Sequence, residues 1–482
     1  MLTKIQLKVW LFAFLIVCAC GSYFLDFEDT LITLTLFSSL ALSLILLLTK
    51  ANWFYFLLIA LIPISIDSEV LGGSKISLPS EAMMVLLLLV FLLFHRAYWS
   101  NLKRIALHPV SILLFTDLII QLATSFTSTH IDFSLKRFII KLLFILLFYV
   151  AVSMIEKPKA LINIFICYAI GLLPVMYFTM RNHSKYDFDL RAVFEMCAPY
   201  FDDHTIYGAC LAFIIPLLII LLKSWRTYSK SKTWYWPFAL LIGFILVSFI
   251  MALSRAAILS LIVAGIFALL LHFRIKFKAI IAILGVIVLG VAMNWNAIYS
   301  TLEQNESVSN DGKFVNHISS VSNVSSDASN LERINRWVCA IRMFKSKPLV
   351  GFGPGTYQFE YHQFQTPQDK TRISTSFGDA GNAHSEYLTY LSENGILGFV
   401  LFIVLVFTTI YYGMQNHYQL SPGILKMANL GVLLGLTTFF IHGLFNMFSD
   451  QVEMAVLVYS SFGVIVWINL HLKKTNVPVN KD

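Results

Sequence analysis

Apolar runs of membrane-spanning length recur along almost the whole of this sequence, and they limit the folds open to it. A helix needs about 20 apolar residues to cross about 30 Å of hydrocarbon, where every backbone amide must find its partner within the protein. Hydrophobic residues make up 58% of the 482 residues and charged residues only 13%, so a soluble core could not bury this surface. The sequence therefore predicts an all-α polytopic membrane protein with about 14 (12–14) transmembrane helices. The runs lie near 8–25, 30–48, 53–67, 81–96, 109–126, 135–154, 160–178, 204–223, 235–252, 256–273, 278–295, 395–413, 426–446 and 452–471.

One long polar segment, from about residue 296 to 392, interrupts this pattern. Its first part, 303–329, is rich in Ser, Asn and Asp without apolar periodicity, which is typical of a mobile loop. From Ser329 to Glu332 the spacing is that of a capping box, and it predicts a helix that continues to Phe344. The segment is therefore expected to form one large, partly helical loop at a membrane surface, where polar chemistry can take place.

The basic residues predict which side of the membrane this loop occupies. With the N-terminus in the cytoplasm, the short connections on that side carry more than half of the 35 Lys and Arg residues, while the opposite side holds most of the acids. This alternation follows the positive-inside rule and predicts that the loop lies outside the cytoplasm. The net charge of +8 is thus explained by topology and does not indicate nucleic acid.

Three cations in and near the loop are candidates for binding an anion. Arg333, Arg336 and Trp337 recur at three- and four-residue steps, so two guanidinium groups share one face of the predicted helix. Arg255 stands between two apolar runs, where an Arg costs up to roughly 2.5–3.5 kcal/mol and is expected to have a partner or a function. The alternatives are a solvated Arg pair and an Arg255 that reaches the head groups. Asp117 is a further intramembrane charge, with a structural or a functional role.

A glycine-rich turn follows the first predicted helix. Gly351, Gly353 and Gly355 precede Tyr357, and glycine lets a backbone turn sharply and approach a ligand closely. The turn lacks the Lys-Ser/Thr ending of a phosphate-binding loop and a preceding strand, so alone it is weak evidence of a site.

A single histidine is the candidate general base. The segment 381–388 predicts a second helix, which ends at Asn394–Gly395 and has His384 in its first turn. A helix N-terminus disfavours a positively charged imidazole, so His384 is expected to be neutral and able to accept a proton near pH 7. The alternative is a structural hydrogen-bonding role.

Three motifs occur in a fixed order: Ser254-Arg255-Ala256-Ala257 at the start of a span, Arg333-x-x-x-Trp337 before Pro348-Leu349-x-Gly351-x-Gly353-x-Gly355, and Ala383-His384-Ser385-x-Tyr387-Leu388. In this order they resemble the O-antigen ligase and O-antigen polymerase family, over roughly residues 238–399. The resemblance divides the chain into N-terminal membrane helices (1–237), a ligase-like core containing the loop (238–399), and C-terminal helices with a short cytoplasmic tail (400–482).

The resemblance implies a metal-independent, inverting glycosyltransferase without a cofactor, in the bacterial cytoplasmic (inner) membrane with its loop facing the periplasm. Such an enzyme moves a glycan from a polyprenyl diphosphate carrier to an acceptor hydroxyl, on lipid A–core or a similar glycan. It implies that Arg255 and Arg333 contact the diphosphate and that His384 is essential. The extra Arg336 leaves the choice between the two loop arginines open. Substrate-binding candidates are Arg336, Trp337, Gly353, Gly355 and Tyr357.

Other functions stay open at this point. A metal-dependent glycosyltransferase would use acidic residues of the predicted external loops, and a transporter or flippase would use polar residues along a path through the spans. A ligase is favoured over a polymerase of the same family. The acidic residues concerned are Asp26, Glu28, Asp29, Asp187 and Asp189.

Overall fold

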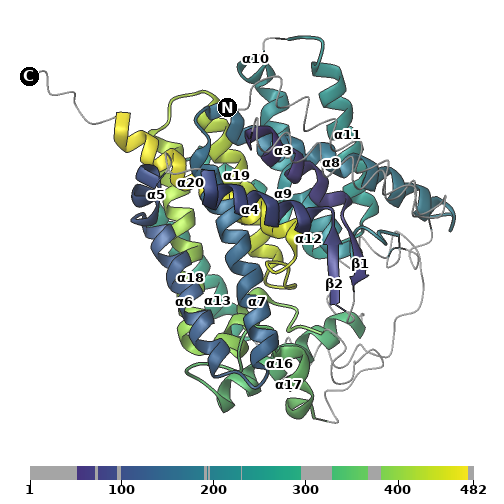
Figure 1. The fold of residues 1–482 in the computed structure, drawn as a ribbon, viewed down its shortest axis with the longest axis vertical. Coiled ribbons are helices and arrows are strands. Elements are labelled where there is room, and N and C mark those ends of the chain that lie inside the picture. The colour runs from purple at the N-terminus through teal and green to yellow at the C-terminus, as the bar shows by residue number, and fades with distance from the viewer. Residues whose placement is uncertain are drawn as a thin grey trace, which may run out of the picture.

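The computed structural model describes residues 51–70, 74–94, 99–188, 193, 196–229, 231–294, 328–366 and 381–475. In this part the chain is a bundle of α-helices with one short β-hairpin (Figure 1). Seven of the described helices are long and apolar enough to cross a membrane. They are α6 (Pro109–Phe126), α8 (Pro158–Ser184), α9 (His204–Lys223), α12 (Arg255–His272), α18 (Glu386–Gln419), α19 (Ile424–His442) and α20 (Val452–Thr475).

The remaining elements are shorter. They are α3 (Ala51–Leu61), η1 (Ile62–Ile64), β1 (Ile66–Val70), β2 (Ser74–Leu78), α4 (Ser80–Phe94), α5 (Trp99–Ala106), α7 (Ile131–Phe144), η3 (Ile145–Val150), η4 (Ala151–Met154), α10 (Trp225–Tyr228), α11 (Tyr235–Met251), α13 (Phe277–Met293), α16 (Ala328–Ser346), α17 (Tyr357–Glu360) and η6 (Tyr361–Phe364). A mainly helical membrane protein is therefore confirmed, whereas the total of about 14 spans is not. The first two predicted runs, 8–25 and 30–48, lie outside the described residues.

The run predicted at 53–67 is only partly helical. Pro63 lies in the first turn of η1, where its missing N–H is tolerated, and the helix ends at Ile64. The chain then forms β1, which pairs antiparallel with β2 so that Ile66 lies opposite Leu78. The polar sequence Asp67-Ser68-Glu69 in β1 explains why an apolar helix does not continue here.

Polar caps determine where the helices that matter for the site begin. The Asp203 carboxylate accepts a hydrogen bond from the Thr205 amide at the start of α9. The hydroxyls of Ser254 and Ser385 accept hydrogen bonds from the amides three residues later, each at 3.4 Å, and begin α12 and α18. Such side-chain oxygens satisfy amides that have no partner within the helix. They therefore place Arg255 and His384 at helix starts.

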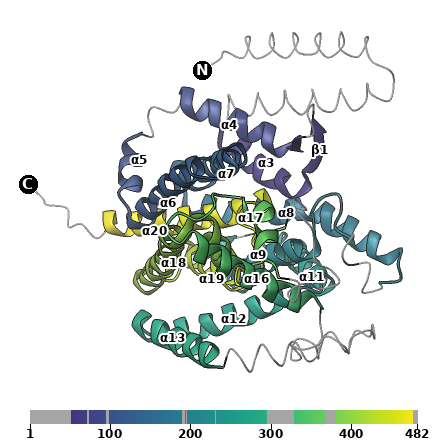
Figure 2. The ribbon, with the colours of Figure 1, turned by 90° about the horizontal axis from the view of Figure 1, so that it is seen from below.

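Small residues allow α19 to pack closely in the middle of the bundle. A Cβ on Gly431 would lie 2.2 Å from the Leu217 side chain of α9, and one on Gly435 would lie 2.7 Å from Phe213. This register makes α9 and α19 antiparallel, so the end of α19 lies level with the start of α9. Figure 2 shows α18, α19 and α20 between α6 and α7 on one side and α12 and α13 on the other.

Candidate functional site

The two loop arginines lie in different surroundings on α16. Arg336 is 4% exposed, its Nε donates to Glu332 Oε1 at 3.0 Å, and its Nη1 donates to the Asn382 carbonyl at 3.0 Å. Arg333, one helical turn earlier, is half-buried and acts electrostatically on the imidazole of His384. Arg336 thus links α16 to the segment before α18, and both guanidinium groups act electrostatically on the imidazole of His384, Arg336 more strongly than Arg333.

The predicted capping box is wrong. Helix α16 begins at Ala328, so Ser329 is inside the helix and cannot be its N-cap. Glu332 instead pairs with Arg336 one turn later, and both side chains are buried. A buried ion pair holds its geometry because either charge alone would be strongly unfavourable.

His384 lies just before α18 and not in its first turn, which corrects the position predicted from the sequence. Its φ of 46° is in the left-handed region, which is uncommon for residues other than glycine, although Asn, Asp and His adopt it more often than most. The His384 amide donates to Asn382 Oδ1 at 2.8 Å, and its carbonyl accepts from Trp337 Nε1 at 3.3 Å. Because the backbone is held on both sides, the strained conformation persists and directs the ring.

The environment keeps this imidazole neutral. Burial lowers the pKa of His384 to about 3, and the neighbouring Arg336 and Arg333 guanidinium groups contribute to the same shift. The direction agrees with the prediction of a neutral ring, but desolvation is the larger cause. A neutral imidazole keeps one nitrogen free of a proton and can act as an acceptor.

The glycine-rich turn packs into a break in α18. Gly395 has a φ of 63°, and the helix is interrupted there, as its predicted end at Asn394–Gly395 suggests. The Gly353 amide donates to the Glu393 carbonyl at 2.8 Å, and the Pro348 carbonyl accepts from the Ile396 amide at 2.8 Å. The turn therefore satisfies backbone groups that the break leaves without helical partners.

A carboxylate from α18 occupies the amides of the same turn. The Gly355 and Tyr357 amides donate to the two carboxylate oxygens of Glu393 at 2.7 and 3.0 Å. A Cβ on Gly353 would lie 2.4 Å from the Ser128 hydroxyl, so glycine is needed here for packing within the protein. The Tyr357 side chain is 1% exposed and donates to the Arg336 carbonyl at 2.8 Å. Substrate contact by these residues stays a prediction, since their observed contacts are internal.

We expect Gly395→Ala to destabilise the protein by more than about 2 kcal/mol, because alanine is strained at this φ and its Cβ would lie 2.3 Å from the Leu349 carbonyl. Thermal unfolding in detergent measures the loss. The matched control is Gly290→Ala in α13, where nothing lies within 4 Å of the added Cβ. Equal midpoints for the two variants would contradict the packing of the turn against α18.

The connection between α19 and α20 joins the starts of α9, α12 and α18. The Ser449 amide donates to the Glu386 carboxylate at 2.7 Å, and Gln451 donates to Asp202 at 3.4 Å. Next to Asp202, the His204 ring lies 2.9 Å from the Ala252 carbonyl, just before α12. The segments predicted to be external thus meet at one end of the bundle. Half-buried Arg255 begins α12 at this same end as His384 and Arg333.

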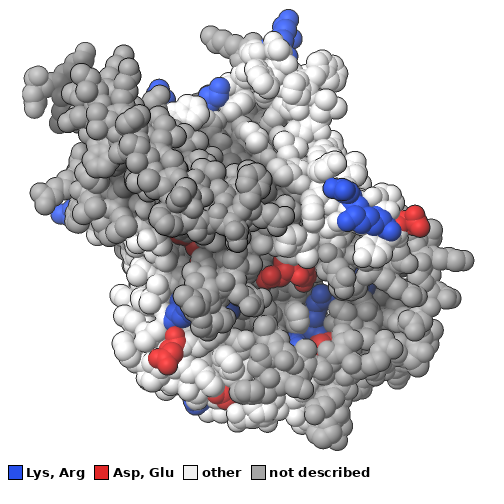
Figure 3. All heavy atoms as spheres, turned by 45° about the vertical axis from the view of Figure 1, so that its right-hand side comes forward, with Lys and Arg blue, Asp and Glu red and all other residues white. Residues whose placement is uncertain are grey.

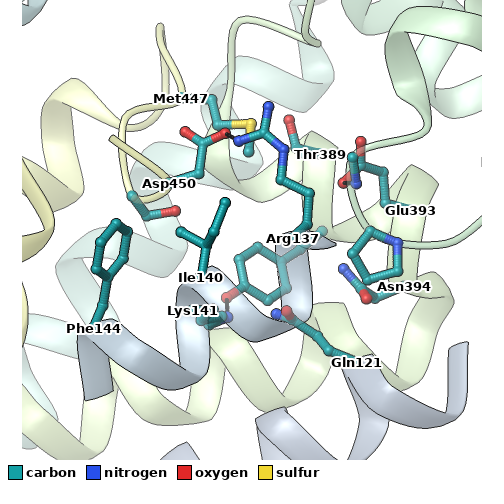
Figure 4. A pocket seen from close by; sticks show the side chains of 14 residues that line it. Gln121, Arg137, Ile140, Lys141, Phe144, Thr389, Glu393, Asn394, Met447 and Asp450 are labelled. Carbon is teal, nitrogen blue, oxygen red and sulfur yellow. Dashed lines mark hydrogen bonds and ion pairs between the residues drawn. The ribbon is translucent and has the colours of Figure 1, made fainter. Parts of the chain in front are cut away.

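A cavity of about 50 Å³ lies between α7, α18 and the α19–α20 connection (Figure 4). Arg137 pairs there with Asp450, and Lys141 pairs with Asp117 at 2.5 Å. The ion pair with Lys141 gives the intramembrane Asp117 a structural role. The cavity has room for water but not for a sugar, so the charges around it stabilise the helix contacts.

Sequence reasoning missed Glu386 and Glu393, which are 1% and 4% exposed. Both carboxylates accept backbone hydrogen bonds: Glu386 holds the α19–α20 connection and Glu393 holds the glycine-rich turn. Buried acids at the start of an apolar helix are unfavourable unless they have partners, and that signal was available in the sequence.

Comparison with known protein families finds a match to this chain. Residues 238–403, about a third of the 482 residues, match a family model described as O-Antigen ligase. No curated protein matches the chain. The matched segment contains Arg255, α16, the glycine-rich turn and His384. The chain therefore carries an O-antigen ligase domain at residues 238–403, and this match supports a relation to the O-antigen ligase family.

Proposed function

We propose that the protein transfers a glycan from a polyprenyl diphosphate carrier to an acceptor hydroxyl, as an O-antigen ligase. The observation that carries this proposal is the neutral imidazole of His384, held in a left-handed turn beside Arg333 at the end of the bundle that also carries Arg255. The family match supports glycosyl transfer of the ligase and polymerase type. Membrane lipids surround the spans, and no nucleic acid takes part.

In the proposed step the acceptor oxygen attacks the anomeric carbon from the face opposite the diphosphate, so the centre is inverted. The acceptor proton passes to the free ring nitrogen of His384. The bond from the anomeric carbon to the diphosphate oxygen breaks, and its electron pair leaves with the diphosphate. Arg333 and Arg255 stabilise that growing negative charge, which guanidinium groups do through paired N–H donors without a metal.

The low pKa of His384 belongs to the protein without substrate. Burial is its first cause, and the positive charges of Arg336 and Arg333 are the second. A dianionic diphosphate beside these arginines offsets the second cause, so the pKa of the ring rises when the donor binds. His384 thus becomes a stronger base in the complex that needs it.

Reconstitution tests the proposal directly. Purified protein, a glycan on polyprenyl diphosphate and lipid A–core are expected to yield glycosylated acceptor and free polyprenyl diphosphate in equal amounts, with or without a chelator. Release of polyprenyl diphosphate without an acceptor product would indicate hydrolysis of the donor, whereas movement of the intact donor across the bilayer would indicate a transporter. If only a second donor molecule serves as acceptor, the enzyme is a polymerase.

Charge distribution supports a periplasmic site. In Figure 3 the upper end of the described surface shows Lys and Arg but no acid, while lower down, toward the end with α16 and α17, acidic side chains appear together with Lys and Arg. This asymmetry fits a cytoplasmic upper end under the positive-inside rule.

Thiol labelling is expected to confirm that orientation. In a variant without the six native cysteines, His362→Cys in η6 should react with an impermeant reagent on intact spheroplasts. Ser421→Cys, in the turn between α18 and α19, is the matched exposed control and should react only after lysis. The reverse pattern would place the site in the cytoplasm.

A further inference from the structure

His442, the last residue of α19, is a buried histidine that the proposed step does not use. It is 2% exposed, and neither of its ring nitrogens has a hydrogen-bond partner among the residues that the structure describes. Buried polar groups in proteins are nearly always paired, so a buried imidazole in this state calls for a specific explanation such as a ligand.

His442 lies at the same end of the bundle as the candidate site. The carbonyl of the next residue, Gly443, accepts the Glu386 amide at 2.8 Å, only two residues after His384. The Arg333 guanidinium is within electrostatic range of both the His384 and the His442 rings. Two imidazoles from segments far apart in the sequence thus lie within electrostatic range of one cation.

The surroundings hold the His442 ring in place. Its carbonyl accepts the Asn446 amide at 3.1 Å, and its ring lies edge-on to Phe448 with centroids 5.3 Å apart. The Glu386 carboxylate in turn accepts the amides of Phe448 and Ser449, each at 2.7 Å. The backbone of His442 and one side of its ring are therefore occupied by protein contacts. Only its two ring nitrogens remain to bind a polar group.

Building on the proposed function, we propose that His442 binds the donor by giving a ring N–H hydrogen bond to a diphosphate oxygen that Arg333 also contacts. An imidazole has at least one N–H in either protonation state, so it can always donate. Hydrogen bonds to an anion are the stronger kind, and a neighbouring guanidinium draws the same anion. His384 then acts on the acceptor and His442 on the donor.

Binding of farnesyl diphosphate, compared with farnesol, tests this assignment. For His442→Leu we expect the Kd for farnesyl diphosphate to rise about 10–100-fold, as for a lost hydrogen bond to a charged group, with farnesol binding unchanged. His442→Gln should recover part of the affinity through its amide N–H. In turnover, KM for the donor should change more than kcat.

Thermal unfolding separates this role from a structural one. Since the His442 ring nitrogens have no hydrogen-bond partner to lose among the described residues, and leucine can still pack against Phe448, His442→Leu should keep the midpoint of the wild type. His417→Leu, a matched histidine near the far end of α18, should leave both midpoint and diphosphate affinity unchanged. If His442→Leu does not fold, the Kd of His442→Gln for farnesyl diphosphate is the deciding measurement.

A Kd of His442→Leu for farnesyl diphosphate within about twofold of the wild-type value would overturn the assignment, since a loss of about tenfold or more is expected. A fall in kcat with that Kd unchanged would assign His442 to the chemical step instead of donor binding. A wild-type protein that does not bind farnesyl diphosphate would instead count against the proposed function.

Discussion

Replacing His384 by Asn is expected to slow glycan transfer about 10²–10⁴-fold while donor binding is retained, because a positioned general base contributes a factor of this size. Asn is the informative substitution because it tolerates the left-handed backbone that His384 adopts, with φ 46°. The backbone contacts to Asn382 and Trp337 then persist, and only the imidazole chemistry is removed. Product formation and donor Kd are measured separately on purified protein.

The pH dependence gives an independent check. The neutral ring is the active form, so activity is lost as pH falls through the pKa of His384. That pKa is about 3 without substrate, so kcat/KM should stay level as pH falls from 8 to 5 unless another group titrates. The bound diphosphate raises the pKa, so kcat should fall at a higher pH than kcat/KM.

His384→Gly is the backbone control, since glycine accepts the same φ without the ring. It should lose transfer as fully as the Asn variant, and added imidazole should restore part of the rate. Near-normal turnover in both variants would make His384 a structural residue. Loss of donor binding would move it into the anion site.

Arg333→Ala is expected to lower transfer at least about 100-fold while the protein remains folded, since removing one stabilising donor at a developing charge has this effect. Arg333→Lys should restore little, because an ammonium cannot make the paired contacts of a guanidinium. Arg255→Ala should behave in the same way. Transfer assays on purified variants with matched protein amounts measure the effect.

Arg336→Ala should fail for a different reason. It removes the Arg336 guanidinium from the buried carboxylate of Glu332, and breaking a buried pair typically costs about 3–5 kcal/mol, so folded protein and not chemistry should be lost. Glu332→Gln combined with Arg336→Gln should recover much of the thermal stability. Lys345→Ala, exposed in the last turn of α16, is the neutral control. If Arg336→Ala is stable but inactive and Arg333→Ala is active, the assignments are reversed. Arg336 would then contact the diphosphate, and Arg333 would not.

Features set by nearby residues could be predicted from the sequence. The apolar runs located most of the described helices, because each segment must satisfy its own backbone in a membrane. Gly395 marked the break in α18 because glycine readily adopts the positive φ, 63°, that interrupts the helix there. His384, Arg333 and Arg255 were nominated by local pattern and by resemblance, and their roles remain proposals.

Other features depend on contacts between distant parts of the chain. The sequence placed Arg333 and Arg336 on one face, but only the fold shows that Arg336 is buried against Glu332 and Asn382. The amides of the glycine turn meet the carboxylate of Glu393, more than thirty residues later. His442 joins the site because α19 packs antiparallel to α9 and ends beside the start of α18. Local pattern determined which residues could carry chemistry, and helix packing decided which of them are buried and which pair with each other, because burial and partners are set by tertiary contacts.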